Sequence, residues 1–108
     1  MTKREDLKIY RNEDVLEIIA AIPRGHYHTR FLIRFKDQEI LLQEATIAAI
    51  VRAYALVSLH PLRRGVILRN RSLKKHEKKI GFAYNQLIEI PGSEEEALDI
   101  ISSIVGDK

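Results

Sequence analysis

The clearest pattern in the chain is the alternation of apolar and charged positions over residues 30–36, RFLIRFK. Large apolar side chains recur at every second position, and cations occupy most of the positions between them. A period of two is typical of a strand with one apolar and one polar face. The polar run 36–39 is short enough to turn the chain back, so residues 40–42 are predicted to pair with this strand as a hairpin.

The segment before this hairpin, 14–22, fits two kinds of element. Its β-branched residues suit a strand, and Pro-Arg-Gly at 23–25 leads straight into the next strand, which favours that interpretation. A helix is the alternative, with Asp14 and Glu17 as a capping pair. The helical face would then consist of Val15, Ile18, Ile19 and Ile22.

Alanine and leucine are frequent in the next segment, which predicts a helix over 45–59 with Thr46 as a cap and Pro61 after its end. This helix is apolar nearly all round, which is typical of a helix that is central in a core or shared with a partner. A chain of this size cannot easily bury one helix on all sides, so a dimer contact is expected here. Tyr54 is expected in the core with its hydroxyl at the rim.

The second half of the chain predicts two strands, 65–71 and 80–90, joined by residues 74–79. Pro91 and Gly92 end the second strand, and Ser93 and Glu96 form the Ser-x-x-Glu pattern of a capping box at the start of a closing helix. Gly106 is expected to stop that helix. The core face of the strand 80–90 is expected to carry Ile80, Phe82, Tyr84, Ile88 and Ile90.

Together these elements predict an α+β fold with the order β-β-β-α-β-β-α. Short turns between neighbouring strands indicate a mostly antiparallel sheet of about five strands, with both helices on one face, as a two-layer sandwich. A chain of 108 residues is long enough for one domain, 1–108, with residues 1–6 frayed.

The amino-acid composition indicates the kind of compartment and organism in which the protein works. The chain has no cysteine, which excludes disulfides and thiolate chemistry and indicates a reducing or a hot compartment. Abundant Ile, Lys, Arg and Glu without Trp are typical of a thermophile. The start has no signal-peptide pattern, and the longest apolar run, 45–59, is interrupted by Arg52 and is too short to span a bilayer. We therefore expect a cytoplasmic protein with no membrane partner.

Charge is distributed unevenly behind the formal net charge of +3. Residues 60–79 contain eight cations and one acid, and residues 24–36 contain four cations and no acid. Residues 93–108 contain five acids and one lysine. A basic run of this kind either binds phosphate or keeps an exposed sheet soluble and guards its edges.

The main functional hypothesis is a small, dimeric module that binds DNA or RNA largely without sequence specificity, through counterion release from the phosphates. Tyr27 is a candidate for stacking on a base. The expected phosphate-binding cations are Arg30, Arg34, Lys36, Arg63, Arg64, Arg69, Arg71, Lys74, Lys75, Lys78 and Lys79.

Other chemistries have less support. His26 and His28 are weak candidates for half of a metal site, with Asp37 as a distant third ligand. No catalytic motif is found, so neither an enzyme nor a bound cofactor is expected. The alternative function is a non-catalytic scaffold protein that assembles through the helix 45–59, and an acidic protein partner on the basic surface is a third possibility.

Overall fold

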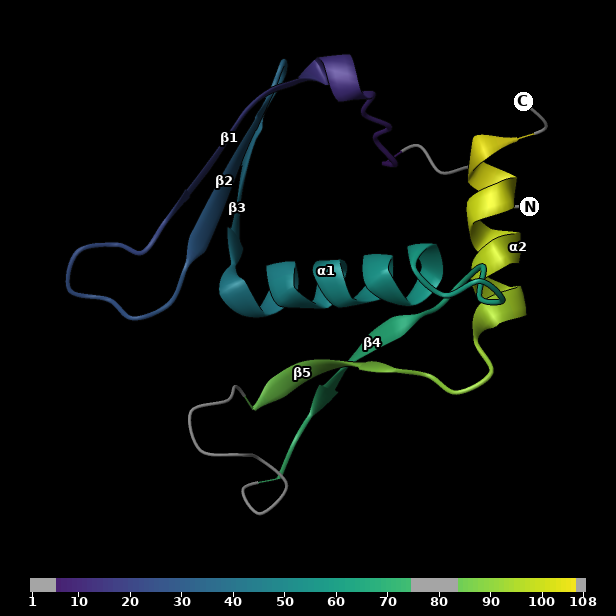
Figure 1. Ribbon diagram of the computed structural model, residues 1–108. Helices are drawn as coiled ribbons and strands as arrows, with labels where there is room; N and C mark the ends of the chain where they lie inside the picture. The colour runs from purple at the N-terminus through teal and green to yellow at the C-terminus, as the bar shows by residue number, and fades with distance from the viewer. Residues whose placement is uncertain (1–5, 75–83, 107–108) are drawn as a thin grey trace. The chain divides into compact units, whose positions relative to one another are not determined.

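The computed structural model describes residues 6–74 and 84–106, which belong to two compact units (Figure 1). Unit 1 is residues 1–44, and unit 2 is residues 45–108. Unit 1 contains the 3-10 helix η1 (Asn12–Asp14) and the strands β1 (Val15–Ala21), β2 (Arg30–Phe35) and β3 (Glu39–Gln43). The second half contains α1 (Glu44–Ser58), β4 (Leu68–Ser72), β5 (Asn85–Glu89) and α2 (Glu94–Val105). The fold is α+β with antiparallel sheets.

Unit 1 is a three-stranded antiparallel sheet in the order β1-β2-β3. Because side chains alternate across a strand, the register defines two faces. The apolar face carries Ile18, Ala20, Phe31, Ile33, Phe35, Ile40 and Leu42. The mixed face has three cross-strand rows, Glu17–Arg34–Glu39, Ile19–Leu32–Leu41 and Ala21–Arg30–Gln43.

The strand prediction for residues 14–22 is confirmed, and the helical alternative is wrong. Asp14 ends η1, where its carboxylate accepts a hydrogen bond of 2.8 Å from the Arg11 backbone, and β1 begins at the next residue. The predicted hairpin is also confirmed, since the Phe35 N–H donates to the Gln38 carbonyl at 2.8 Å and β2 pairs with β3.

The residues before η1 are attached to the β2–β3 turn. The Tyr10 ring stacks on Phe35 with 3.9 Å between the ring centroids, and its hydroxyl donates to Asp37 at 2.8 Å. Lys8 Nζ lies 2.7 Å from the same carboxylate. The hydrogen bonds from Lys8 and Tyr10 lower the pKa of Asp37, and Asp37 raises the pKa of Lys8. An exposed ion pair of this kind adds little stability, so the stacking of the two rings stabilises this attachment more.

The predicted helix 45–59 is confirmed as α1, although it starts one residue earlier, at Glu44. Thr46 therefore lies inside the first turn and is not the cap. Tyr54 was expected in the core, but 67% of its surface is exposed. The helix ends at Ser58, three residues before Pro61, whose ring cannot continue it.

In unit 2, β4 and β5 form an antiparallel hairpin, and α1 runs close to it (Figure 1). The Arg52 side chain of α1 donates to the Leu87 carbonyl of β5. Strand β4 begins at Leu68 rather than at Gly65 as predicted, and the preceding segment contacts the start of α2 through Gly65 and Ile67. A Cβ atom at the buried Gly65 would lie only 2.9 Å from the Glu94 carbonyl oxygen, so this close approach requires glycine.

The predicted capping box at the start of α2 is wrong, although the helix itself is confirmed. Ser93 makes no side-chain cap hydrogen bond; its Oγ accepts from the Ile67 backbone N–H at 2.9 Å. Gly106 ends the helix with φ of 79°, a backbone conformation that favours glycine, and its N–H donates to the Ser102 carbonyl.

The single five-stranded sheet expected from the sequence is not observed. Among the described residues the strands form two separate sheets, of three strands and two strands. The buried residues of the described ranges all lie in unit 2: Ala49, Gly65, Ser93 and Ala97. In residues 6–44 no residue is buried, so the sheet of unit 1 has no closed core of its own.

Candidate nucleic-acid interface

One of the predicted cations, Arg34 of β2, is paired with acids from both neighbouring strands. Arg34 lies between Glu17 of β1, at 2.8 Å, and Glu39 of β3, at 2.6 Å. The hydrogen bonds to Glu39 and then Glu17 raise the pKa of Arg34. This row of the mixed face therefore carries two acids and one cation, and a phosphate there would meet a net negative charge.

Lys36 and Arg30 are also engaged locally. Lys36 Nζ lies 3.3 Å from Asp14, whose pKa is lowered first by the Arg11 backbone N–H and further by Lys36. The Arg30 guanidinium donates to the backbone carbonyl of His28 at 3.1 Å and more weakly to that of Thr29. Unit 1 as a whole has eight cations and eight acids, so its formal charge is zero.

The positive charge of the protein lies in unit 2, which has ten cations and seven acids. On the β4–β5 hairpin, the register places Arg69 opposite Ile88 and Arg71 opposite Gln86 on one face. Both arginines are exposed. The Leu73 N–H donates to the Tyr84 carbonyl, so the same face continues to Tyr84, whose surface is 49% exposed. We call these five residues (Arg69, Arg71, Tyr84, Gln86 and Ile88) the arginine face of the hairpin.

Two further cations of the predicted set lie before β4. Arg63 pairs with Glu89 of β5 at 2.6 Å, with both side chains partly buried, so this ion pair connects the segment before β4 to β5. Arg64 is exposed, and its backbone N–H donates to the Glu94 carboxylate at 2.5 Å. The charge of Arg63 is therefore used in an ion pair within the fold, whereas the side chain of Arg64 lies at the surface.

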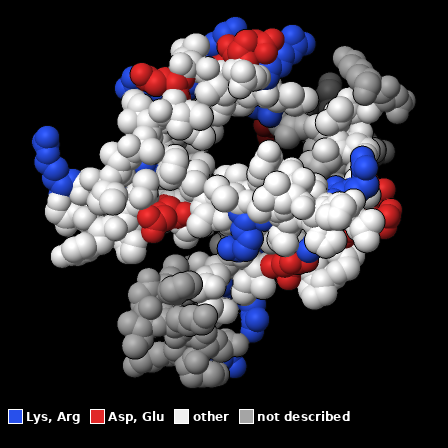
Figure 2. All heavy atoms as spheres, viewed as in Figure 1, with Lys and Arg blue, Asp and Glu red and all other residues white. Residues whose placement is uncertain are grey.

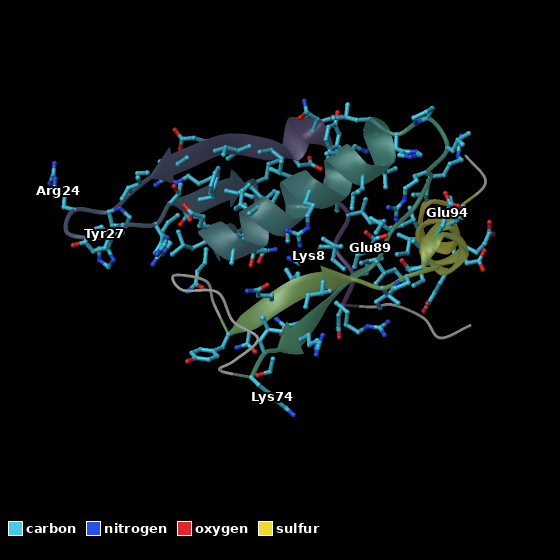
Figure 3. The ribbon with its side chains drawn as sticks, turned by 60° about the horizontal axis from the view of Figure 1, so that its bottom comes forward. Lys8, Arg24, Tyr27, Lys74, Glu89 and Glu94 are labelled. Carbon is cyan, nitrogen blue, oxygen red and sulfur yellow. The ribbon has the colours of Figure 1, made fainter. Side chains whose placement is uncertain are left out.

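The remaining lysines of the prediction follow β4. Lys74 is exposed and points away from the hairpin (Figure 3). Lys75, Lys78 and Lys79 lie outside the described residues. Figure 2 shows acidic and basic atoms beside one another at the top of the view, above the β1–β3 sheet, as the ion pairs of unit 1 require.

Tyr27, the base-stacking candidate, lies at the tip of the β1–β2 loop beside Arg24 (Figure 3). Its surface is 90% exposed. A turn shapes this tip, since the His26 N–H donates to the Pro23 carbonyl at 2.9 Å and Gly25 has φ of 81°. The tip belongs to unit 1 and the arginine face to unit 2.

The two histidines considered as metal ligands have different surroundings. His28 Nδ1 lies 3.2 Å from the Glu44 carboxylate, whereas His26 is exposed in the loop turn. Within residues 6–74 and 84–106, no group of three or more His, Asp or Glu side chains is arranged to hold a metal ion. His28 and Glu44 instead act as a contact between the β1–β2 loop and the first residue of α1.

The sequence analysis predicted neither that Tyr84 lies at the surface nor that acids pair with Arg34 of β2. Tyr84 was assigned to the core face by alternation alone, and its exposure depends on packing that alternation does not define. The Arg34–Glu39 pair follows from the hairpin register, because the two residues are symmetric about the turn at 36 and 37. Fixing that turn in the sequence would have revealed it.

Comparison of the chain with protein-family models, with curated proteins and with solved structures finds no match. Neither α1 nor α2, the helices in the described part of the chain, is long and apolar enough to cross a membrane.

Proposed function

We propose that the protein is a non-catalytic module that binds nucleic acid through the β4–β5 hairpin of unit 2. The supporting observation is the arginine face, where Arg69 and Arg71 are exposed on one side of a two-stranded ribbon. The charge of unit 2 supports the same surface, because the cations of unit 1 are balanced by acids.

The binding mode is phosphate contact without base readout. Arginines on a ribbon contact the sugar–phosphate backbone, and the affinity then falls as salt replaces the released counterions. Lys74 and the following lysines, Lys75, Lys78 and Lys79, extend the cationic run along the chain. Tyr84 supplies an aromatic ring on the arginine face for stacking on an unpaired base.

A salt titration of binding to mixed-sequence DNA and RNA tests this proposal. The double variant Arg69→Ala/Arg71→Ala is expected to flatten the slope of log K against log salt by about two units. The matched control is Arg11→Ala/Arg24→Ala, which removes two exposed cations from unit 1 and leaves the slope unchanged. No binding at low salt, or equal slopes for the two variants, contradicts the proposal.

A second candidate function is assembly through α1, and one observation favours it. Ile50, Val51 and Tyr54 lie within one turn of this helix, and between 53% and 67% of the surface of each is exposed. Water-exposed apolar patches of this kind mark interaction surfaces. Light scattering tests it, since Val51→Glu is expected to reduce the oligomer to a 12.5 kDa monomer if α1 is the contact.

A further inference from the structure

Strand β1 is an edge of the sheet in unit 1, and its outer side pairs with no strand in the described part of the chain. Leu16 and Ile18 are each 63% exposed, and Ile19 is 40% exposed. The backbone N–H and C=O groups on that side are therefore a template for another strand. This makes the edge an interaction surface that the hairpin proposal does not involve.

Strand β1 has one of the usual protections of an edge, the irregularity between Val15 and Glu17, and lacks most of the others. Natural edge strands carry lysines, prolines or inward charges, or are very short, whereas β1 has seven residues and a single charge, Glu17. That charge is held by Arg34 in the neighbouring strand. A register irregularity between Val15 and Glu17 leaves residues 17–21 as a regular five-residue edge.

We propose that β1 pairs in antiparallel fashion with β1 of a second copy of the chain, about a two-fold axis through Ile19. The two three-stranded sheets then join into one sheet of six strands. In this register Ile19 lies opposite Ile19 of the second copy, Ile18 opposite Ala20, and Glu17 opposite Ala21. A two-fold axis normal to the sheet keeps every side chain on its own face, so the faces of both copies continue across the contact.

The charged rows of the mixed face favour a second copy as the occupant of this edge. The joined row would read Gln43–Arg30–Ala21 and then Glu17–Arg34–Glu39 of the second copy. Arg30 donates to backbone carbonyls, and among the described residues it has no ion pair. Across the small Ala21, Glu17 of the second copy would lie roughly 9–10 Å from Arg30 by strand spacing and would keep its pair with Arg34. The symmetry gives this charge match twice.

The apolar positions match in the same register. The central row of the mixed face would become six apolar residues long, because Leu41, Leu32 and Ile19 meet the same three residues of the second copy. On the apolar face, Ile18 would lie opposite Ala20 of the second copy. The row of Ile18 and the row of Ala20 would then each continue into an apolar row of the second copy. In this register, apolar residues of one copy lie beside apolar residues of the other, and the row of Arg30 continues into the row of Glu17.

The neighbouring registers do not give this match. An axis through Ile18 would place Glu17 opposite Ile19 and break the apolar row. An axis through Ala20 would place Ile19 opposite Ala21, which brings the apolar row against the row of Arg30. Because directly opposite residues must share a face, only registers centred on a residue are allowed, and the one at Ile19 pairs like rows correctly.

The absence of cysteine from the chain gives a clean test of this register. In Ile19→Cys the two introduced thiols lie directly opposite each other, within the Cα separation that a disulfide requires, so mild oxidation is expected to give a covalent dimer. The matched control is Ile22→Cys, also at an exposed site. Its two thiols lie six residues apart along the strands, about 20 Å, and do not cross-link.

Light scattering on the wild-type chain and two variants completes the test. The wild type is expected at about twice 12.5 kDa, Ile19→Val at the same mass, and Ile19→Lys at the monomer mass, since two lysines would meet at the axis. A wild-type monomer at all concentrations overturns the proposal. So does equal cross-linking of the two cysteine variants, or a dimer that survives Ile19→Lys and is lost in Val51→Glu.

Discussion

Single residues decide whether a charged pattern along the chain becomes a charged surface. Arg34 follows the alternation of β2, yet it accounts for no net positive charge, because one carboxylate on each neighbouring strand lies within 2.8 Å of it. Arg69 and Arg71 follow the same alternation on β4 and lie opposite Ile88 and Gln86, which carry no charge. The neighbouring strands place carboxylates opposite Arg34, whereas β5 places none directly opposite Arg69 or Arg71.

Glu44 is a residue whose charge the protein uses structurally. Its carboxylate accepts from the Thr29 backbone N–H at 2.9 Å and contacts His28 at 3.2 Å. These contacts, the Thr29 hydrogen bond first, lower the pKa of Glu44 below its ordinary value of 4.5. The charged form is therefore favoured in the folded state, and the residue links the β1–β2 loop to the start of α1.

We expect Glu44→Ala to lower the urea midpoint of unfolding at neutral pH. Because the folded pKa is depressed, the stabilisation is fully present above the unfolded pKa and is lost as pH falls through the folded pKa. The gap between wild type and variant is therefore expected to close below pH 4.5. Glu13→Ala, which loses only a 4.0 Å contact with Arg11, serves as the control. A gap that is independent of pH would contradict this role.

At the scale of elements, the first turn of α2 is fixed to the segment before β4 by its side-chain acceptors. Ser93 Oγ accepts from the Ile67 N–H, and the Glu94 carboxylate accepts from the Arg64 N–H. Ser93 is 4% exposed, so no water replaces it easily. This helix start thus serves a tertiary contact rather than its own cap.

We expect Ser93→Ala to cost about 1–3 kcal/mol of unfolding free energy, because a partly buried N–H of Ile67 loses its acceptor. Glu96→Ala is expected to change stability by less than about 0.5 kcal/mol, as for an ordinary exposed position. Chemical denaturation measures both variants, and amide exchange at Ile67 should accelerate in Ser93→Ala alone. An equal loss of unfolding free energy in the two variants would contradict this role and would support the capping box.

The elements themselves were predictable from local patterns. Alternation defined β2, the Ala-rich run defined α1, and Pro91, Gly92 and Gly106 bounded the last strand and helix. The misassigned details depend on contacts far apart in the sequence. Gly65 and Ile67 contact the start of α2 in the segment where a strand was predicted, and no local sequence pattern indicates that contact.

At the scale of the whole molecule, the sequence predicted an α+β fold but not how its strands divide into sheets. Strands that follow one another along the chain pair with each other in both sheets, whereas a single sheet would require pairing between strands that are not consecutive. Alternation predicted that Arg69 and Arg71 share one face of β4, but it did not predict the acids that pair with the cations near β2. There the neutralising acids Glu17 and Asp14 reach the strand only through tertiary pairing.

The two units also differ in what protects their backbone. The buried residues of the described ranges lie in unit 2, whereas the sheet of unit 1 has an open edge at β1. Alternate N–H groups of an edge strand point toward the neighbouring strand, and the others point outward. Only the outward set of β1 would gain acceptors in the proposed six-stranded sheet.

Hydrogen exchange measured by NMR at two protein concentrations therefore gives a whole-molecule prediction. The outward amides of residues 17–21 are expected to be protected at high concentration and to exchange rapidly once the dimer is diluted apart. The alternate amides that face β2 should change much less, and those of the β4–β5 hairpin should not respond to concentration, because their acceptors are within the chain. Ile19→Lys is expected to abolish the dependence of amide exchange in β1 on protein concentration. If the outward amides of β1 are protected equally at both concentrations, the edge is covered within one chain and the second copy is not its partner.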